Sequence, residues 1–151
     1  RIEFKGHNLI VRNLQCSDYF KGIFSLLSQL TNKTITISQR KFMNYLDNLN
    51  NNYKIIVVED TSKDTIIGTI TFFIEYKIIH NCGIVMHIED LVISNSSRNI
   101  GLGKYLINRC SNIAKELECY KIILNCNDEN VPFYEKCGFE KKENEMVFYI
   151  I

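Results

Sequence analysis

The sequence is poor in features that mark several classes of protein. It contains one proline in 151 residues and no run of the roughly 18 apolar residues that a membrane-spanning helix needs. Its 18 basic and 17 acidic side chains leave a formal net charge of +1. Such a small charge argues against broad electrostatic binding to nucleic acid or to an anionic membrane surface. We therefore expect no nucleic-acid partner and no membrane span.

Signals for secretion, metal binding and linkers are also missing. The stretch RIEFKGHNLIV (1–11) has no signal-peptide core, which favours a cytoplasmic protein. The six cysteines include no C-x-x-C pair, so we interpret them as free thiols in a reducing compartment and expect no metal. No Gly/Ser-rich or charged block divides the chain, and we expect a single domain over residues 1–151.

The chain does contain many apolar residues in regular patterns. Hydrophobic residues make up 46% of it, enough for a substantial core. Their periodicity predicts helices at 17–30, 38–49, 100–117 and 131–139, with Ser17, Ser38 and Asn130 as N-caps of three of them. Strands are predicted at 7–14, 53–60, 65–79, 83–94, 120–126 and 144–151. This order predicts an α+β protein with a sheet of mixed strand direction.

The strand predicted at 83–94 is irregular beside two adjacent acids, Glu89 and Asp90. The even-numbered residues from Ile84 to Ile88 can share one face, but residues 91–93 are apolar in succession, so the alternation slips. A β-bulge explains the slip, and bulges often lie beside active sites because they re-aim side chains. A strand buried on both faces, with two acids near its exposed end, explains it equally well.

The turn after this strand has the features of an anion-binding helix N-terminus. It reads RNIGLGK (98–104) and leads directly into a helical pattern. Two glycines expose backbone N–H groups, the helix dipole favours an anion, and Lys104 adds a cation. The spacing fits neither a Walker loop nor a Rossmann loop, which needs Gly or Ala where Leu106 stands. The alternative is a glycine-rich helix start without a ligand.

These motifs resemble a known family. RNIGLG fits [QR]-x-x-G-x-[GA], the pyrophosphate-binding signature of the GNAT acyl-CoA N-acyltransferases. Within that superfamily, KIIH, HIEDLVI, GLGKYLI, CYKIIL and NVPFYEKCGF, in this order over residues 77–139, resemble the glucosamine-6-phosphate N-acetyltransferases. The resemblance implies the GNAT fold, a mixed, mostly antiparallel central sheet flanked by helices, with a bulged and splayed central strand.

The resemblance also implies an activity. Acetyl would pass from acetyl-CoA to the amine of D-glucosamine 6-phosphate, giving N-acetyl-D-glucosamine 6-phosphate and CoA on the route to UDP-N-acetylglucosamine. Glu89 and Asp90 would accept the amine proton, directly or through water, or would only bind the sugar. A backbone N–H at the bulge would stabilise the oxyanion, and the Tyr134 phenol would assist the departing thiolate. A core aromatic beside Phe133 is the other interpretation of Tyr134.

Contacts to both substrates follow from the same resemblance. The pantetheine arm of CoA would pair with the backbone of Leu91, Val92 and Ile93. Its pyrophosphate would lie on the segment comprising Arg98, Asn99, Ile100, Gly101, Leu102, Gly103 and Lys104, with Asn130 and Tyr134 also touching CoA. The sugar phosphate would meet Thr31, Lys77, Ile78, Ile79, His80, Tyr120, Lys121 and Asn125, besides the two acids.

Two departures from the family pattern affect the acceptor side. Asn125 stands where the family has an acidic residue, and Tyr149 stands where it has an arginine that clasps the phosphate from the partner subunit. Losing that arginine weakens phosphate binding unless another cation, such as Lys77 or Lys121, replaces it. The family implies a homodimer whose C-terminal strands cross between subunits.

Two other functions compete with this one. A GNAT enzyme for a different amine, such as a polyamine, an antibiotic or a protein lysine, would need an acidic groove, and Lys77, His80 and Lys121 argue against that. A non-catalytic CoA-binding module is the third reading, against which the intact loop and Tyr134 argue.

Overall fold

Six strands form one sheet in the order of the chain. The computed structural model describes the backbone of residues 2–4, 7–31 and 33–150, and the side chains of residues 8–31 and 33–150. The strands are β1 (Ile2–Phe4), β2 (His7–Asn13), β3 (Tyr53–Asp60), β4 (Thr65–Tyr76), β5 (Ile84–Ile93) and β6 (Cys119–Leu124). All neighbours are antiparallel except β5 and β6, which are parallel. The predicted mixed α+β sheet is confirmed, although β1 was not predicted.

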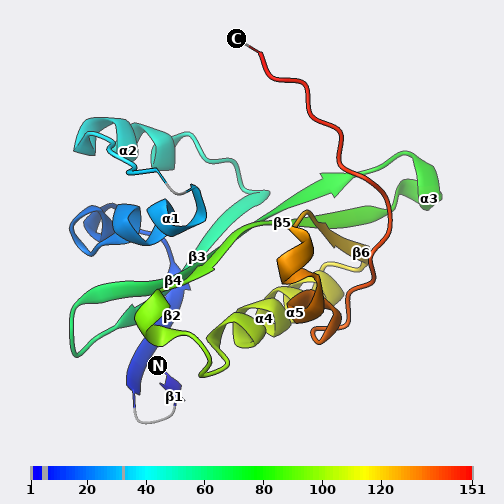
Figure 1. Ribbon diagram of the computed structural model, residues 1–151. Coiled ribbons are helices and arrows are strands. Elements are labelled where there is room, and N and C mark those ends of the chain that lie inside the picture. The colour runs from blue at the N-terminus through cyan, green and yellow to red at the C-terminus, as the bar shows by residue number, and fades with distance from the viewer. Residues whose placement is uncertain (1, 5–6, 32, 151) are drawn as a thin grey trace.

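Helices cover both faces of this sheet (Figure 1). On one face lie the 3₁₀ helix η1 (Cys16–Phe20), α1 (Ile23–Thr31) and α2 (Gln39–Asp47), and on the other lie α4 (Leu102–Glu116) and α5 (Val131–Glu135). Shorter turns are α3 (Ile79–Cys82) and the 3₁₀ helices η2 (Asn95–Ser97) and η3 (Asp128–Asn130). Ser38 caps α2 as predicted, because its hydroxyl accepts a hydrogen bond from the Lys41 backbone N–H.

Each helical layer has its own core. Along α4 the buried residues Leu102, Leu106, Cys110 and Ala114 recur at helical spacing and face the sheet. They share a core with residues of β3, β4 and β5, among them Ile56, Ile70, Phe72, Met86 and Ile88. On the opposite face Ile23 and Leu26 of α1 pack with Val57, Ile66 and Val92. Strand β5 therefore contributes side chains to both cores and is packed between them.

Two predicted boundaries were wrong. The helix predicted at 17–30 is two elements, because Gly22 adopts a left-handed conformation (φ +79°) between η1 and α1. Ser17 consequently lies inside η1 and is not an N-cap. The strand predicted at 65–79 ends at Tyr76, and three successive non-glycine residues, His80, Asn81 and Cys82, have φ between 55° and 57° in the turn that follows.

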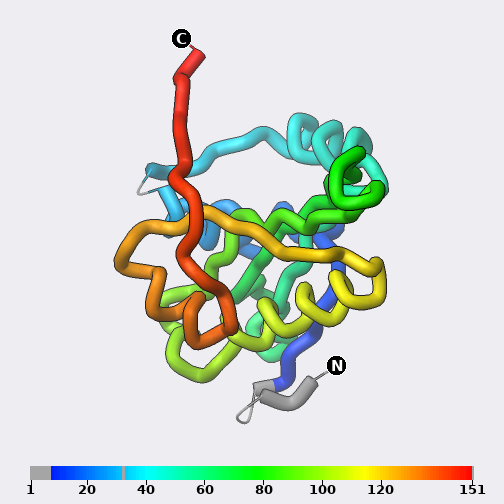
Figure 2. The backbone as a smooth tube through the Cα atoms, turned by 90° about the vertical axis from the view of Figure 1, so that its right-hand side faces the viewer, coloured from blue at the N-terminus to red at the C-terminus, as the bar shows by residue number. Residues whose placement is uncertain are grey.

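The strand predicted at 144–151 was also wrong for the described residues. Residues 144–150 form no strand, and the final residue lies outside the described part of the chain. Figures 1 and 2 show this segment running away from the sheet, with Met146, Phe148 and Ile150 each about nine-tenths exposed. A strand needs a neighbour for its backbone hydrogen bonds, and this segment has no such neighbour among the described residues.

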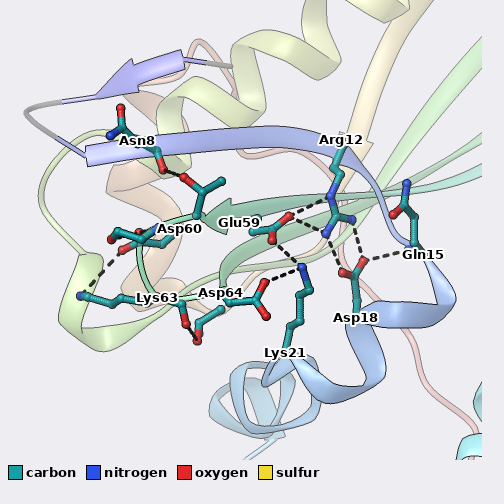
Figure 3. A network of polar contacts seen from close by, with 12 residues as sticks. Asn8, Arg12, Gln15, Asp18, Lys21, Glu59, Asp60, Lys63 and Asp64 are labelled. Carbon is teal, nitrogen blue, oxygen red and sulfur yellow. Dashed lines mark hydrogen bonds and ion pairs between the residues drawn. The ribbon is translucent and has the colours of Figure 1, made fainter.

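A buried polar network ties η1 to the sheet (Figure 3). The Arg12 guanidinium of β2 donates to both carboxylate oxygens of the fully buried Asp18, at 2.7 and 2.6 Å, and to Glu59 Oε2 of β3 at 2.7 Å. Lys21 Nζ donates to Glu59 Oε1 at 2.6 Å and also pairs with Asp64. The hydrogen bonds from Lys21 and then Arg12 lower the pKa of Glu59, against the opposing effect of its burial.

This network predicts how stability depends on pH. Because the folded-state pKa of Glu59 is lowered, its contribution is complete above the unfolded value of ~4.3 and is lost as pH falls through the folded value. Glu59→Gln should reduce the free energy of unfolding at pH 7 by about 1.5–3 kcal/mol, as for a hydrogen-bonded charge. The measurement is urea unfolding from pH 7 to pH 3, with the exposed Glu140→Gln as control. A deficit that stays constant at every pH would contradict the assignment.

Candidate active site

A β-bulge interrupts the pairing of β5 with β4 beside the two adjacent acids. Thr71 faces Glu89 and Thr69 faces Val92, so Asp90 and Leu91 together lie opposite the single residue Ile70. Asp90 takes a left-handed conformation with φ +48°, which is uncommon outside glycine. The predicted bulge is confirmed, although β5 is also buried on both faces, as fully buried Val85 and Met86 show.

The bulge places both carboxylates on the same face of the sheet. Glu89 is the cross-strand partner of Thr71, and Thr71 lines a cavity together with Asp90 on the α1/α2 side. Ile88 and Leu91, before and after the pair, belong to the core under α4. In a regular strand Glu89 and Asp90 would point to opposite faces. The extra residue therefore turns two sequence neighbours into a pair of acids.

The cavity beside Asp90 has a volume of about 220 Å³. Its walls come from α1, α2, the segment between them and the sheet. They comprise Leu14, Ile23, Phe24, Leu27, Ile37, Lys41, Phe42, Tyr45, Ile55, Thr69, Thr71 and Asp90. Most of this surface is hydrocarbon, and the sequence pattern did not predict the cavity, because its walls come from six separate stretches of the chain. Thr31, expected to contact the sugar, lies one helical turn beyond Leu27.

The surroundings of Glu89 raise the pKa of its carboxyl group. Partial burial is the main cause, the negative charge of Asp90 adds to it, and His87 opposes it. The pKa of Tyr53 is also raised, chiefly by burial of its phenol and by its hydrogen bond with Tyr45. The negative charges of Asp90 and Glu89 add to this shift. A carboxylate whose pKa is raised toward neutrality is a stronger proton acceptor, which suits a general base.

His87 is a site neighbour that the sequence patterns did not single out. It lies two residues before Glu89 on β5 and stacks on Phe73 of β4, with ring centroids 4.3 Å apart. Its Nε2 lies 2.7 Å from Glu75 Oε2, and Glu75 is also hydrogen-bonded to Lys77. Its spacing of two residues from Glu89, which puts both on one strand face, was the available signal.

Strands β5 and β6 separate where the bulge begins. Their parallel pairing runs from Ile84 with Cys119 to Ile88 with Leu124, where β6 ends while β5 continues to Ile93. The segment Leu91–Ile93 therefore pairs with β4 on one edge only, and the Arg98 side chain donates to the Ile93 carbonyl at 3.1 Å. The predicted splay is confirmed. It leaves one backbone edge open to an added extended chain.

The glycine-containing loop leads directly into α4. Asn99 and Gly101 have φ +63° and +98°, Gly101 is the N-cap, and α4 then runs for 15 residues from Leu102. Among the expected anion-binding residues, Leu102 is buried and Ile100 half-buried, so only their backbone groups suit a ligand, while Lys104 is exposed. A Cβ on Gly103 would lie 3.1 Å from the Phe133 ring, so this glycine lets α5 approach the start of α4.

Tyr134 lies half-buried in α5 between two aromatic rings. Its ring meets Phe133 and Phe139 edge-on, at 5.0 and 5.9 Å between centroids. Burial, followed by nearby Cys126 and Cys137 and then Glu89, raises the pKa of the phenol to about 12. The hydroxyl therefore stays protonated at neutral pH and can donate.

The start of α5 agrees only in part with its prediction. Asn130 occupies the N-cap position, but its side chain makes no capping hydrogen bond and its dihedrals are helical (φ −93°, ψ −12°), so the predicted cap was wrong. Residues 128–130 instead form a 3₁₀ turn that continues into α5. Pro132 does lie in the first turn, as predicted.

The other expected sugar contacts lie at the far tip of the β4–β5 hairpin. The residues from Lys77 to His80, including exposed Ile78 and Ile79, form the turn, and the His80 ring lies 4.6 Å from Tyr120 at the start of β6. Lys121 extends over the Tyr120 ring. Exposed Asn125, in contrast, follows Leu124, the partner of Ile88, and so lies near Glu89 and away from this tip. Five residues of β5 separate this tip from Glu89, roughly 17 Å at ~3.4 Å per residue. The Lys77 side chain, however, reaches back to Glu75, which also contacts His87, two residues before Glu89.

A metal site and a membrane-spanning helix are both absent from the described residues, 2–4, 7–31 and 33–150. Within these, no three His, Cys, Asp or Glu side chains lie together as a metal site would require. No helix in the same part of the chain is long and apolar enough to span a bilayer.

Comparison with known proteins gives consistent results. Residues 15–139 match the acetyltransferase (GNAT) family. Glucosamine 6-phosphate N-acetyltransferase 1 of Dictyostelium discoideum is 40% identical over 141 residues, which cover 92% of this chain and 89% of that protein. The corresponding enzyme of Candida albicans is 38% identical over 90% of this chain and 92% of its own length. The crystal structure of glucosamine-6-phosphate N-acetyltransferase from Arabidopsis thaliana superposes with a TM-score of 0.89 at 35% identity, covering 95% and 99% of the two chains.

Proposed function

The chain belongs to the GNAT acetyltransferase family, and from this we propose that it transfers acetyl from acetyl-CoA to the amine of D-glucosamine 6-phosphate. Relatives bearing that name match it over most of both lengths. The observation that carries the proposal is the bulge, which sets two carboxylates on one face beside an open strand edge. The product, N-acetyl-D-glucosamine 6-phosphate, is a precursor for UDP-N-acetylglucosamine.

The open edge and the loop suit the two ends of acetyl-CoA. The pantetheine amides pair with Leu91–Ile93, where β6 no longer does, as an added strand would. The pyrophosphate lies on the backbone N–H groups of residues 99–104, at the N-terminus of a 15-residue helix, with Arg98 and Lys104 nearby. Asn130, just before α5, completes the contacts along the cofactor.

The chemistry requires one proton to leave the amine and one to reach the sulfur. Glu89, whose carboxyl pKa is raised, takes the amine proton directly or through water, with Asp90 beside it. The nitrogen–carbon bond forms, and a backbone N–H freed at the bulge stabilises the negative charge on the carbonyl oxygen. The carbon–sulfur bond then breaks, and the Tyr134 hydroxyl donates to the departing thiolate.

A homodimer completes the acceptor site in this proposal. The backbone of the hairpin tip that carries His80 lies roughly 17 Å from Glu89 within one chain, which is a long span for one sugar phosphate. The exposed apolar segment 146–150, which includes Tyr149, has no strand neighbour in the described chain. A second copy of the chain would bring its own hairpin-tip residues close to the first copy's Glu89 and Asp90. It would also provide a strand neighbour for segment 146–150.

The assembly prediction is tested by size and activity together. Light scattering at micromolar concentration should give twice the mass of one 17.7 kDa chain. Truncation after Glu145 should shift the protein toward monomer and reduce turnover, because the acceptor site then lacks its second half. A fully active monomer would rule out the shared site.

The oxidation state of the six cysteines indicates the redox environment in which the protein works. All are free thiols, and burial raises the pKa of three of them, Cys110 to about 12, and also Cys119 and Cys137. Persistent free thiols are typical of a reducing environment, which supports a cytoplasmic enzyme.

The acceptor prediction is tested by acetyl-CoA consumption. Thiol release should be rapid with glucosamine 6-phosphate and at least about tenfold less efficient, in kcat/KM, with unphosphorylated glucosamine, because a charged hydrogen-bonding partner is lost. Spermidine and lysine peptides serve as alternative amines. Preference for one of these amines would leave the acetyltransferase assignment intact but would overturn glucosamine 6-phosphate as the acceptor.

The acid role of Tyr134 predicts a specific loss of turnover. Tyr134→Phe removes one hydroxyl and little packing, so acetyl-CoA binding should barely change. Turnover should fall at least about tenfold, toward the lower limit of general acid catalysis, because the interaction strengthens as the sulfur gains charge. The measurement is thiol release at saturating acetyl-CoA, with melting temperature as the folding check. The exposed Tyr76→Phe is the matched control, and turnover within twofold of the parent at position 134 would make Tyr134 a core aromatic only.

A further inference from the structure

The cavity beside Asp90 exceeds what an acetyl group needs. Acetyl carries a single methyl beyond its carbonyl carbon, whereas the cavity measures about 220 Å³. An apolar protein cavity of ~150 Å³ is large enough to bind benzene. The space therefore suits a hydrocarbon chain of several carbons.

The lining of this cavity selects hydrocarbon over a sugar phosphate. Phe24, Leu27, Ile37, Phe42 and Ile55 supply its apolar walls. Among the polar residues that line it, Thr69 already donates its hydroxyl to the Ile56 carbonyl at 3.0 Å. Lys41, Tyr45, Thr71 and Asp90 are the other polar residues of the lining, but most of the surface inside is hydrocarbon, and methylene groups gain from leaving water there.

The position of the cavity connects it to the acyl group. Asp90, Thr69 and Thr71 form the part of its lining that belongs to the bulge. In the proposed reaction the thioester carbonyl lies at this bulge, so the substituent on the carbonyl carbon starts next to Asp90. A longer acyl chain then extends between α1, α2 and the sheet.

We propose that this cavity is an acyl pocket, and that the enzyme also transfers acyl groups of about three to six carbons from acyl-CoA to the same amine. The inference rests on the proposed function and widens its donor class. The bond changes are unaltered, since the nitrogen–carbonyl bond forms and the carbonyl–sulfur bond breaks. The amine proton goes to the Glu89–Asp90 pair, and the CoA thiolate receives its proton from Tyr134.

Position 37 offers a matched pair of variants that change the pocket in opposite directions. Ile37 lines the cavity from the segment between α1 and α2, outside every helix and strand, so changes there perturb the fold little. Ile37→Phe fills the space and Ile37→Ala enlarges it. Ile35 lies two residues earlier in the same segment, is similarly half-buried and is not part of the cavity lining. Ile35→Phe and Ile35→Ala are therefore the controls.

The experiment compares kcat/KM for acetyl-, propionyl-, butyryl- and hexanoyl-CoA with glucosamine 6-phosphate. In the parent, butyryl-CoA should be used within about tenfold of acetyl-CoA. Ile37→Phe should lower the butyryl value at least about tenfold and leave acetyl within twofold, because one methylene in an apolar pocket changes kcat/KM by ~10–200-fold. Ile37→Ala should raise hexanoyl relative to acetyl by about fivefold or more. Mass spectrometry identifies the N-acyl sugar phosphate.

The outcomes separate this inference from the function on which it rests. Acetyl transfer without butyryl transfer, or acyl preferences unchanged by both position 37 variants, overturns the pocket and leaves the acetyltransferase. No transfer from any donor overturns the proposed function itself. If Ile37→Phe fails to fold, Ile37→Ala still decides, because it cannot overpack the site.

Discussion

The extra residue in β5 is the feature on which the rest of the active site depends. Without it, Glu89 and Asp90 would alternate across the sheet and only one could face the acceptor side. The same insertion releases backbone groups from the ladder, close to where β6 ends. A proton acceptor, an oxyanion donor and an open strand edge therefore arise from one local change of register.

The surrounding packing is what makes this strained geometry tolerable. A left-handed non-glycine residue such as Asp90 costs about 1–2 kcal/mol. Ile88 on one side of the bulge and Val92 on the other are anchored in different cores, under α4 and under α1 respectively. The network of Arg12, Asp18 and Glu59 holds η1, at the start of the α1 layer, against β2 and β3. The bulge is thus fixed from both faces.

Gly103 links the loop proposed to bind the cofactor to Tyr134, the proposed general acid. Its missing side chain lets Phe133 come against the first turn of α4, and Tyr134 follows Phe133 in α5. The loop that suits a pyrophosphate and the phenol that suits a thiolate are consequently positioned by the same helix contact. Backbone exposure alone, which the motif suggested, is only part of the reason for this glycine.

The sequence by itself determined whatever depends on neighbours along the chain. Helical spacing predicted α2 and α4, broken alternation left a bulge as one of two explanations, and the run RNIGLGK predicted a helix start suited to an anion. The resemblance added the expected roles of Glu89, Asp90 and Tyr134. Tertiary structure alone decided that both acids share a face with a cavity, because six separate stretches of the chain build its walls. It also decided that MVFYII, although apolar enough for a strand, forms none among the described residues, since periodicity reports which residues favour burial and cannot supply the neighbour that a strand requires.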